Sequence, residues 1–322
     1  MPTTQAEELQ KILLKRRMNV FFTSRYLNRI PRLLDTLFTI YRLKNQYVLV
    51  NIQFYGGFAL ILEDLASLLA KLLNKKIIFT LHGGAIPVKV KKYPKWYARV
   101  LKRGLMITSP SIYLITELDY LNLPFCCIEN SLPLSQYLFQ DKISFKPRIL
   151  WMRSFHPIYN PLMALQVFQL ILIKYPDAVL YMAGVDLGYQ METKKTAKEM
   201  GLSKSVTFPG FQDIQGKNHL ASLCDLYMCT NRIDNTPVTI LEMMALGLPI
   251  VTTNVGGIPY MIKNNEAFLV DSENPQQMAN AILKILNDPT YALSMIDRGR
   301  TLVKTYDEEI VANKWVDLFQ SL

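Results

Sequence analysis

The chain has 322 residues, of which 50% are hydrophobic and 19% charged, so it is neither disordered nor of low complexity. Its four cysteines form no CxxC pair, which argues against a zinc site or disulfide framework and favours reduced thiols in a cytoplasmic protein. Residues 1–150 carry 22 Lys and Arg against 9 Asp and Glu, whereas residues 151–322 carry 14 against 17. This asymmetry predicts two halves with different partners.

The first half alternates predicted helices and strands. It opens with a helix at Ala6–Arg17, whereas a doubly wound domain usually opens with a strand and a glycine-rich turn, so the usual first strand is expected to be missing. The helix around Ile30–Tyr41 has apolar residues at helical spacing and is strongly amphipathic. Strands are predicted at Asn19–Thr23, Tyr47–Phe54, Lys76–Leu81, Leu105–Ser109 and Pro124–Glu129.

A second series of strands and helices comes after the polar stretch Asp141–Arg148, which is the best linker candidate. Repeated strand–helix units predict parallel sheets covered by helices, hence an α/β fold with two doubly wound domains at residues 1–146 and 147–306. Ligands of such folds bind beyond the carboxyl ends of strands, here in a cleft between the domains. The C-terminal helix at 307–322, with apolar Val311, Trp315 and Leu318, is expected to pack back on the first domain.

Two features of the sequence bear on membrane association: the long uncharged stretches and the clusters of basic residues. The polar, acidic start Met1–Gln10 predicts no signal peptide, and Asn45–Leu62 and Met243–Ile262 contain too many polar, Gly or Pro residues to span a bilayer. The basic clusters of the first half are either solvated helix faces or a contact with an anionic membrane surface. Nucleic acid is not expected as a partner, because no zinc-finger or RNA-recognition pattern accompanies the charge.

The strongest motif begins at Asp234 and continues through a short helix to Pro249. Thr236-Pro237 reads as an N-cap followed by proline at the first helical position. The amides of Val238 and Thr239 then lie at the positive end of the helix dipole and form an anion site for a diphosphate. Glu242, roughly 7.5 Å along the axis from Pro237, suits a ribose diol, and Asp234 lies on the other side of the phosphates.

These residues resemble the retaining glycosyltransferases of family 4, which have the GT-B fold of two facing Rossmann-like domains. The signature of that family is an acidic residue, seven intervening residues and a Glu, here Asp234 and Glu242. Similarity to the family continues on both sides of the signature. It includes Gly247–Val251 and Thr253–Pro259 on the C-terminal side, and Ala183-Gly184 and Val206–Gly210 on the N-terminal side.

The resemblance implies a role for each matching residue. Glu242 binds the ribose, whereas Asp234 and His82 face the transferred sugar as the catalytic pair. Arg153 and the start of the helix bind the diphosphate, so no metal or other cofactor is needed. The donor-binding set is then Glu242, Val238, Thr239, Pro237, Arg153, Gly184 and Gly210, and the acceptor-side residues are Gly83 and Gly84. The family usually has a Lys shortly after the Arg; here His156, Tyr159 or Asn160 are the candidates to replace it.

The resemblance therefore implies a hexosyltransferase that moves a sugar, with retention, from a nucleotide diphosphate sugar to a glycan or lipid-linked acceptor, in surface or extracellular polysaccharide synthesis. It is expected to be cytoplasmic, with peripheral attachment to the inner face of the membrane. Two alternatives remain open: an inactive GT-B protein that serves as a sugar-nucleotide-binding or scaffold subunit, and a sugar-nucleotide epimerase of related fold.

Overall fold

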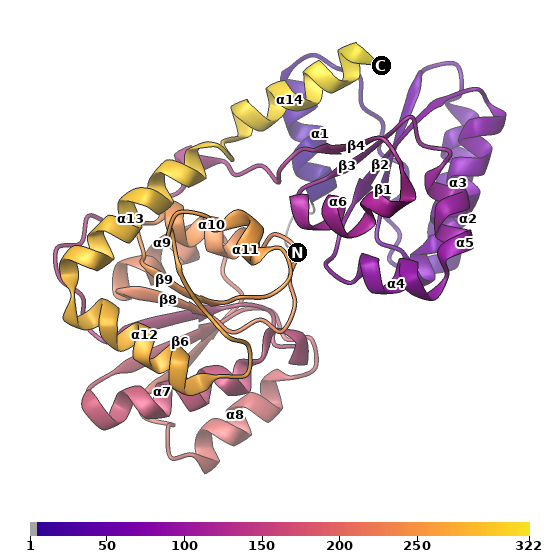
Figure 1. Ribbon diagram of the computed structural model, residues 1–322. Helices are drawn as coiled ribbons and strands as arrows, with labels where there is room; N and C mark the ends of the chain where they lie inside the picture. The colour runs from indigo at the N-terminus through magenta and orange to yellow at the C-terminus, as the bar shows by residue number, and fades with distance from the viewer. Residues whose placement is uncertain (1–4) are drawn as a thin grey trace. The chain divides into compact units, whose positions relative to one another are not determined.

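The computed structural model describes residues 5–322, so the first four residues of the polar N-terminal stretch lie outside the described part of the chain. The chain divides into two compact units (Figure 1). The first contains residues 5–131 and Val311–Leu322, and the second contains Leu132–Ile310. None of the helices within residues 5–322 has the length and apolar character needed to cross a bilayer.

The boundary between the units lies at Ser131 and Leu132, so the predicted division between residues 146 and 147 is wrong. The polar composition of Asp141–Arg148 suggested a linker. However, this stretch and the residues just before it contain apolar side chains that attach them to the second unit. Leu132, Tyr137 and Phe145 are buried in the hydrophobic core of the second unit. Burying such side chains stabilises the attachment of this segment, which therefore belongs to the second unit.

The first unit is built on a parallel sheet with the order β1-β2-β3-β4. Its strands are β1 (Leu49–Phe54), β2 (Lys76–Leu81), β3 (Met106–Ser109) and β4 (Phe125–Cys127). Its helices are α1 (Gln5–Lys15), α2 (Arg29–Arg42), α3 (Leu60–Leu72), α4 (Ile86–Lys92), α5 (Pro94–Leu101), α6 (Ile112–Leu118) and most of α14 (Glu308–Ser321), with short 3-10 turns η1 (Gly57–Ala59) and η2 (Asp119–Leu121).

Alternate residues of β2 face two different hydrophobic clusters, as the pleat of a strand requires. Ile77 and Phe79 pack in the larger cluster with residues of α3, α4 and α5. Ile78 points to the other side, where it packs with Leu13 of α1 and Trp315 of α14. The C-terminal helix thus covers one face of the first sheet, through its apolar residues.

Strand β1 forms an open edge of this sheet. The carbonyls of Val48 and Phe54 accept hydrogen bonds from the amides of Lys76, at the start of β2, and His82, just after it. The main-chain groups of the alternate residues Leu49, Asn51 and Gln53 therefore point away from β2. Within residues 5–322 no strand pairs with that edge, and a cavity of about 550 Å³ lies beside it. The predicted strand at Asn19–Thr23 is wrong: this segment lines the cavity but forms no strand.

Helix α2 presents its apolar side to solvent, contrary to the usual orientation of an amphipathic helix. Ile30, Leu34 and Phe38 are 73%, 63% and 60% exposed, whereas Thr36, Thr39 and Ile40 face the interior. The periodicity of the sequence predicted the helix and its apolar face, but not the direction in which that face points.

The second unit has a six-stranded parallel sheet with the order β10-β9-β8-β5-β6-β7. Its strands are β5 (Arg148–Met152), β6 (Val179–Ala183), β7 (Val206–Gly210), β8 (Leu226–Cys229), β9 (Ile250–Thr253) and β10 (Phe268–Val270). Its helices are α7 (Pro161–Lys174), α8 (Gln190–Glu199), α9 (Ile214–Leu223), α10 (Val238–Ala245), α11 (Ile258–Met261), α12 (Pro275–Asn287) and α13 (Pro289–Lys304), with 3-10 turns η3 (Leu134–Gln136) and η4 (Pro157–Tyr159).

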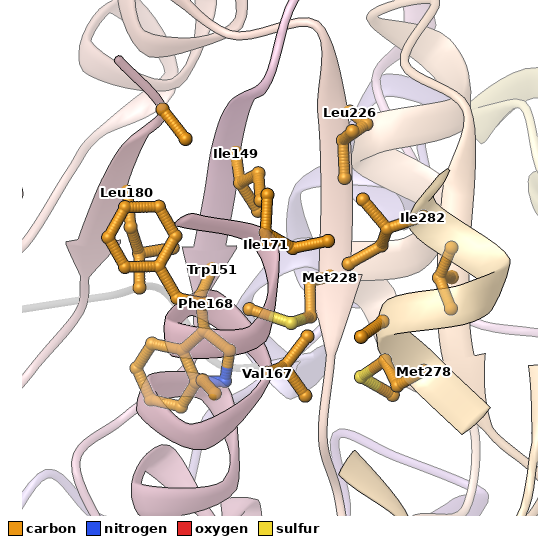
Figure 2. Close-up of a cluster of buried hydrophobic side chains, with 14 of the residues drawn as sticks. Ile149, Trp151, Val167, Phe168, Ile171, Leu180, Leu226, Met228, Met278 and Ile282 are labelled. Carbon is orange, nitrogen blue, oxygen red and sulfur yellow. The ribbon is translucent and has the colours of Figure 1, made fainter. Parts of the chain in front are cut away.

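One core of the second unit fills the space between this sheet and helices α7 and α12, as Figure 2 shows. Trp151 of β5 and Phe168 of α7 are fully buried there, and Trp151 donates a hydrogen bond to Thr230. The order of the strands reverses between β5 and β8, which are neighbours in the sheet although far apart in sequence. Doubly wound sheets bind ligands at the carboxyl ends of the strands at such a point.

Candidate functional site

Helix α10 begins next to the carboxyl end of β8 and supplies the first part of the site. It begins one residue later than predicted, because Pro237 is the N-cap, with φ −69° and ψ 104°, rather than the first helical residue. The first helical amides are therefore those of Val238 and Thr239, which have no carbonyl of a preceding turn to bind. They retain the predicted position at the positive end of the helix dipole.

Arg153 follows β5 directly, and its largely buried guanidinium joins β5 to α10. It donates to Asp234 at 2.6 Å and to the Thr239 hydroxyl at 3.0 Å, and it lies 4.1 Å from the centroid of the Tyr159 ring. Burial alone disfavours the cation, but the nearby Asp234 charge offsets this and raises the pKa of Arg153 above its ordinary value. The guanidinium therefore stays charged beside the start of α10.

Asp234 is held by its own loop as well as by Arg153. Its carboxylate accepts hydrogen bonds from the Asn231 side chain at 2.7 Å and the Asn235 amide at 2.8 Å. Its carbonyl accepts from Gly257, and a Cβ at Gly256 would lie 2.0 Å from that carbonyl oxygen. The close approach explains why the sequence has glycine at position 256, where φ is +55°.

Glu242 lies one turn into α10 and is only 5% exposed. One carboxylate oxygen, Oε1, accepts from the Lys217 ammonium at 2.6 Å and from the Tyr137 hydroxyl at 3.0 Å. The other oxygen, Oε2, is buried without a hydrogen-bond partner among residues 5–322. A buried carboxylate oxygen without a partner is costly, so Glu242 retains an acceptor for a ligand hydroxyl.

Neither partner of Glu242 was identified from the sequence. Lys217 lies on α9 and Tyr137 just after Ser131, near the start of the second unit, and both are far from Glu242 along the chain. A lysine on α9 and a tyrosine among apolar residues carry no pattern that points to a distant carboxylate.

The two predicted glycines lie at the ends of adjacent strands. The amide of Gly184, after β6, donates to the carbonyl of Gly210 at the end of β7 at 2.9 Å. A Cβ at Gly184 would lie 1.9 Å from the Arg153 carbonyl oxygen, so only glycine lets β6 approach Arg153 this closely. A Cβ at Gly210 would have no heavy atom within 4 Å, so glycine is favoured there by the backbone conformation, with φ of +78°, and not by a close contact.

The residues expected to replace the family lysine have structural roles. His156 accepts from the Ile158 amide, and Asn160 caps α7 through the Met163 amide and donates to Glu273. Tyr159 stacks against Arg153. Among these side chains, none adds a cation beside Arg153.

His82 belongs to the first unit, where it follows β2. Its Nε2 lies 2.6 Å from Gln53 Oε1 and its ring stacks on Tyr55. Because the amide oxygen of Gln53 is an acceptor, Nε2 carries the proton, and Nδ1 remains an acceptor. Burial lowers the pKa of His82 to about 4, so the imidazole is neutral at pH 7. Gly83 and Gly84 continue from it into the turn before α4, with φ of +89° at Gly83.

A buried carboxylate of α3, Glu63, supports this histidine indirectly and was not identified from the sequence. It accepts hydrogen bonds from the amides of Tyr55 at 2.7 Å and Gly56 at 3.1 Å, and so fixes the ring that stacks on His82. Burial raises the pKa of Glu63 to about 7, against the opposing effect of those two amides.

The structure thus brings Arg153, Asp234 and Thr239 into direct contact, with Gly184 against Arg153 and Glu242 farther along α10. All of these residues lie within or beside a segment that matches a known family. The pattern of glycosyl transferases group 1 matches residues 139–302, just over half of the chain. The chain belongs to this family.

A curated relative and two solved structures extend the comparison. An uncharacterized glycosyltransferase of Haemophilus influenzae is 30% identical over 155 residues, which cover 47% of this chain and 42% of that protein. HepE of Anabaena, solved in complex with UDP, has a TM-score of 0.76 and 16% identity, covering 97% of this chain and 89% of its own. Sucrose-phosphate synthase of Thermosynechococcus elongatus has a TM-score of 0.77 and 18% identity, and the match covers 93% of this chain and 81% of that protein's chain. The two units have the GT-B fold.

Proposed function

We propose that this glycosyltransferase family member transfers a hexose from a nucleotide diphosphate sugar, with retention at the anomeric carbon, as in family 4. The observation that carries the proposal is the Arg153–Asp234–Thr239 contact at the start of α10, with the unpartnered Glu242 Oε2 on the same helix. The complex of HepE with UDP, in a protein of the same fold, supports a nucleotide as the ligand.

The donor lies along α10 in this proposal. Its diphosphate binds the Arg153 guanidinium and the amides of Val238 and Thr239, where positive charge is already present. A ribose hydroxyl donates to Glu242 Oε2, the acceptor that has no protein partner among residues 5–322. Pro237, Gly184 and Gly210 shape the surrounding main chain.

The transferred sugar faces Asp234 and His82. A neutral His82 accepts a hydrogen bond from a sugar hydroxyl at Nδ1 and contributes no charge. The acceptor hydroxyl attacks the anomeric carbon from the face that the diphosphate leaves, and the departing phosphate oxygen takes the proton. The bond to the diphosphate oxygen breaks as the new glycosidic bond forms, so the reaction needs no metal or other cofactor.

We propose a glycan or a lipid-linked glycan as the acceptor, with Gly83 and Gly84 on the acceptor side. The product then serves surface or extracellular polysaccharide synthesis from the cytoplasmic side of the membrane. The uneven charge of the chain supports this choice, because the half that carries His82 has the excess of Lys and Arg. A basic surface attracts the anionic headgroups of the membrane that holds such acceptors.

Isothermal titration of the full chain against UDP-, GDP- and ADP-sugars tests the donor. We expect the sugars of one of these nucleotides to bind. Their affinity should stay the same when EDTA removes divalent cations, because a guanidinium and a helix N-terminus provide the positive charge. Binding of none of the three series, or a strict need for Mg²⁺ or Mn²⁺, would contradict the proposal.

The sugar-facing pair is tested by Asp234→Asn and His82→Ala. Each variant should slow the hydrolysis of the bound sugar donor by about 10²-fold, the typical effect of removing one hydrogen bond made to the transition state. Nucleoside diphosphate should bind at least as tightly as to the unaltered chain, because neither side chain is assigned to the nucleotide and Asp234→Asn leaves the charge of Arg153 unshared. A large loss of nucleoside diphosphate affinity in either variant would move that residue out of the sugar subsite.

A further inference from the structure

Two helices of the first unit expose large apolar side chains in regular rows. The spacing within each row is three or four residues, so each row forms one stripe along its helix. The row on α2 and the turn before it is Leu27, Ile30, Leu34, Phe38 and Tyr41, and the row on η1 and α3 is Phe58, Ile61, Leu65, Leu68 and Leu72. These ten residues form the α2–α3 face.

The two rows belong to one surface. Helices α2 and α3 pack against each other, as Figure 1 shows within this unit. The guanidinium of Arg29 on α2 lies 4.6 Å from the centroid of the Phe58 ring, which joins the two rows at one end. Phe58 and Leu72, at the two ends of the second row, are 78% and 71% exposed. A monomer rarely exposes so many adjacent apolar side chains unless another surface covers them.

Cations border the α2–α3 face. Arg25, Arg29, Arg42 and Lys71 are exposed. The Arg42 guanidinium lies 5.6 Å from the Phe38 ring centroid, and Lys44 lies 4.4 Å from that of Tyr41. Such side chains cover apolar surface with their stems and keep their charge at the water boundary.

The carboxylates of the same helices do not cancel this charge at the surface. Glu63 is buried beneath α3, and Asp64 is paired with Arg99 and Arg103. Asp35 on α2 is half-buried. The face therefore combines exposed apolar rows with bordering cations that form no ion pair with a carboxylate of α2 or α3.

We propose that the α2–α3 face docks on an anionic membrane surface. The apolar rows enter the boundary between headgroups and acyl chains, and the bordering Arg and Lys side chains bind lipid phosphates. A second copy of the chain fits less well, because a two-fold interface through this face would bring the cationic borders of the two copies together. The inference goes beyond the proposed function, on which it rests only in bringing a membrane-bound acceptor to the enzyme.

Flotation of the full chain with phosphatidylcholine vesicles containing increasing fractions of phosphatidylglycerol tests the proposal. The unaltered chain should bind more tightly as the anionic fraction rises, and added salt should weaken this binding. Leu34→Gln with Phe38→Gln preserves charge and helix propensity, and should reduce the partition coefficient by about tenfold or more. The matched control is Ile173→Gln, an exposed apolar residue on α7 of the second unit, which should bind like the unaltered chain.

The contribution of charge is tested separately with Arg25→Gln and Arg42→Gln together. This pair should remove most of the preference for phosphatidylglycerol, whereas Lys198→Gln with Lys204→Gln, exposed lysines of the second unit, should retain it. If the chain with Leu34→Gln and Phe38→Gln bound vesicles as tightly as the unaltered chain, the proposal would be overturned. The absence of vesicle binding by the unaltered chain would overturn it as well. Dimerisation seen by sedimentation velocity and abolished by that variant would assign the face to a second copy instead.

Nucleotide binding by the same variants separates this inference from the proposed function. The Leu34→Gln and Phe38→Gln variant should bind the nucleotide sugar as the unaltered chain does, because neither residue belongs to the second unit. A chain that docks on vesicles but binds no nucleotide sugar would refute only the proposed function, and the converse result would refute only the docking surface.

Discussion

Glu242→Ala is expected to weaken nucleotide-sugar binding by about 100-fold, because the hydrogen bond from a ribose hydroxyl to this charged acceptor contributes up to about 3 kcal/mol. The carboxylate is buried, preorganised by Lys217 and Tyr137, and keeps Oε2 for the ligand. The alanine variant loses that acceptor and leaves the Lys217 ammonium without its partner. Isothermal titration with the nucleotide that binds the unaltered chain measures the effect.

Two further variants separate recognition from folding. Glu242→Gln retains the shape and one acceptor oxygen, so its affinity should fall by about tenfold, between the unaltered chain and the alanine variant. Glu199→Ala removes a carboxylate from an exposed pair with Lys195 in the same unit and should leave the affinity unchanged. Equal dissociation constants for the unaltered chain and both Glu242 variants would show that this residue does not bind the donor.

Gly184→Ala is expected to destabilise the second unit by about 2–4 kcal/mol and to abolish donor binding, since overpacking and left-handed backbone strain add together. The new Cβ would lie 1.9 Å from the Arg153 carbonyl oxygen and 2.7 Å from the carbonyl carbon. The main chain at Arg153 must then move, which carries its guanidinium away from Asp234 and Thr239. Urea unfolding and titration with nucleotide measure the two effects.

Gly188→Ala is the matched control for this variant. Gly188 also has a positive φ, +90°, but a Cβ there would meet nothing within 4 Å. This substitution should therefore cost only the backbone strain, about 1–2 kcal/mol, and leave the nucleotide affinity unchanged. If the two variants had equal stability and affinity, the close contact between Gly184 and Arg153 would be of no consequence.

The charge balance of the site bears on donor affinity. The family lysine expected after Arg153 is absent, and Lys217 does not replace it, because its ammonium is already bound to Glu242. Arg153 is likewise paired with Asp234. A diphosphate bound as proposed would therefore meet a guanidinium shared with a carboxylate, and the amides at the start of α10 would supply the remaining positive potential.

The sequence by itself determined the class of fold and predicted which residues at the start of α10 lie close together. Alternating strand and helix patterns indicated two parallel α/β domains, and local spacing along one helix related Val238, Thr239 and Glu242. Such relations are readable because they depend on residues a few positions apart, whose geometry follows from helical periodicity. The predicted start of α10 differs from the observed start by one residue, because proline is compatible both with the N-cap position and with the first helical turn.

The tertiary structure alone decided the features that depend on distant contacts. The partners of Glu242 come from α9 and from the segment after Ser131, and apolar anchors attach that segment to the second unit rather than leaving it as a linker. Periodicity shows that α2 has an apolar side but not which way it turns. That direction depends on which surface packs against Thr36, Thr39 and Ile40, and long-range packing carries no local signal in the sequence.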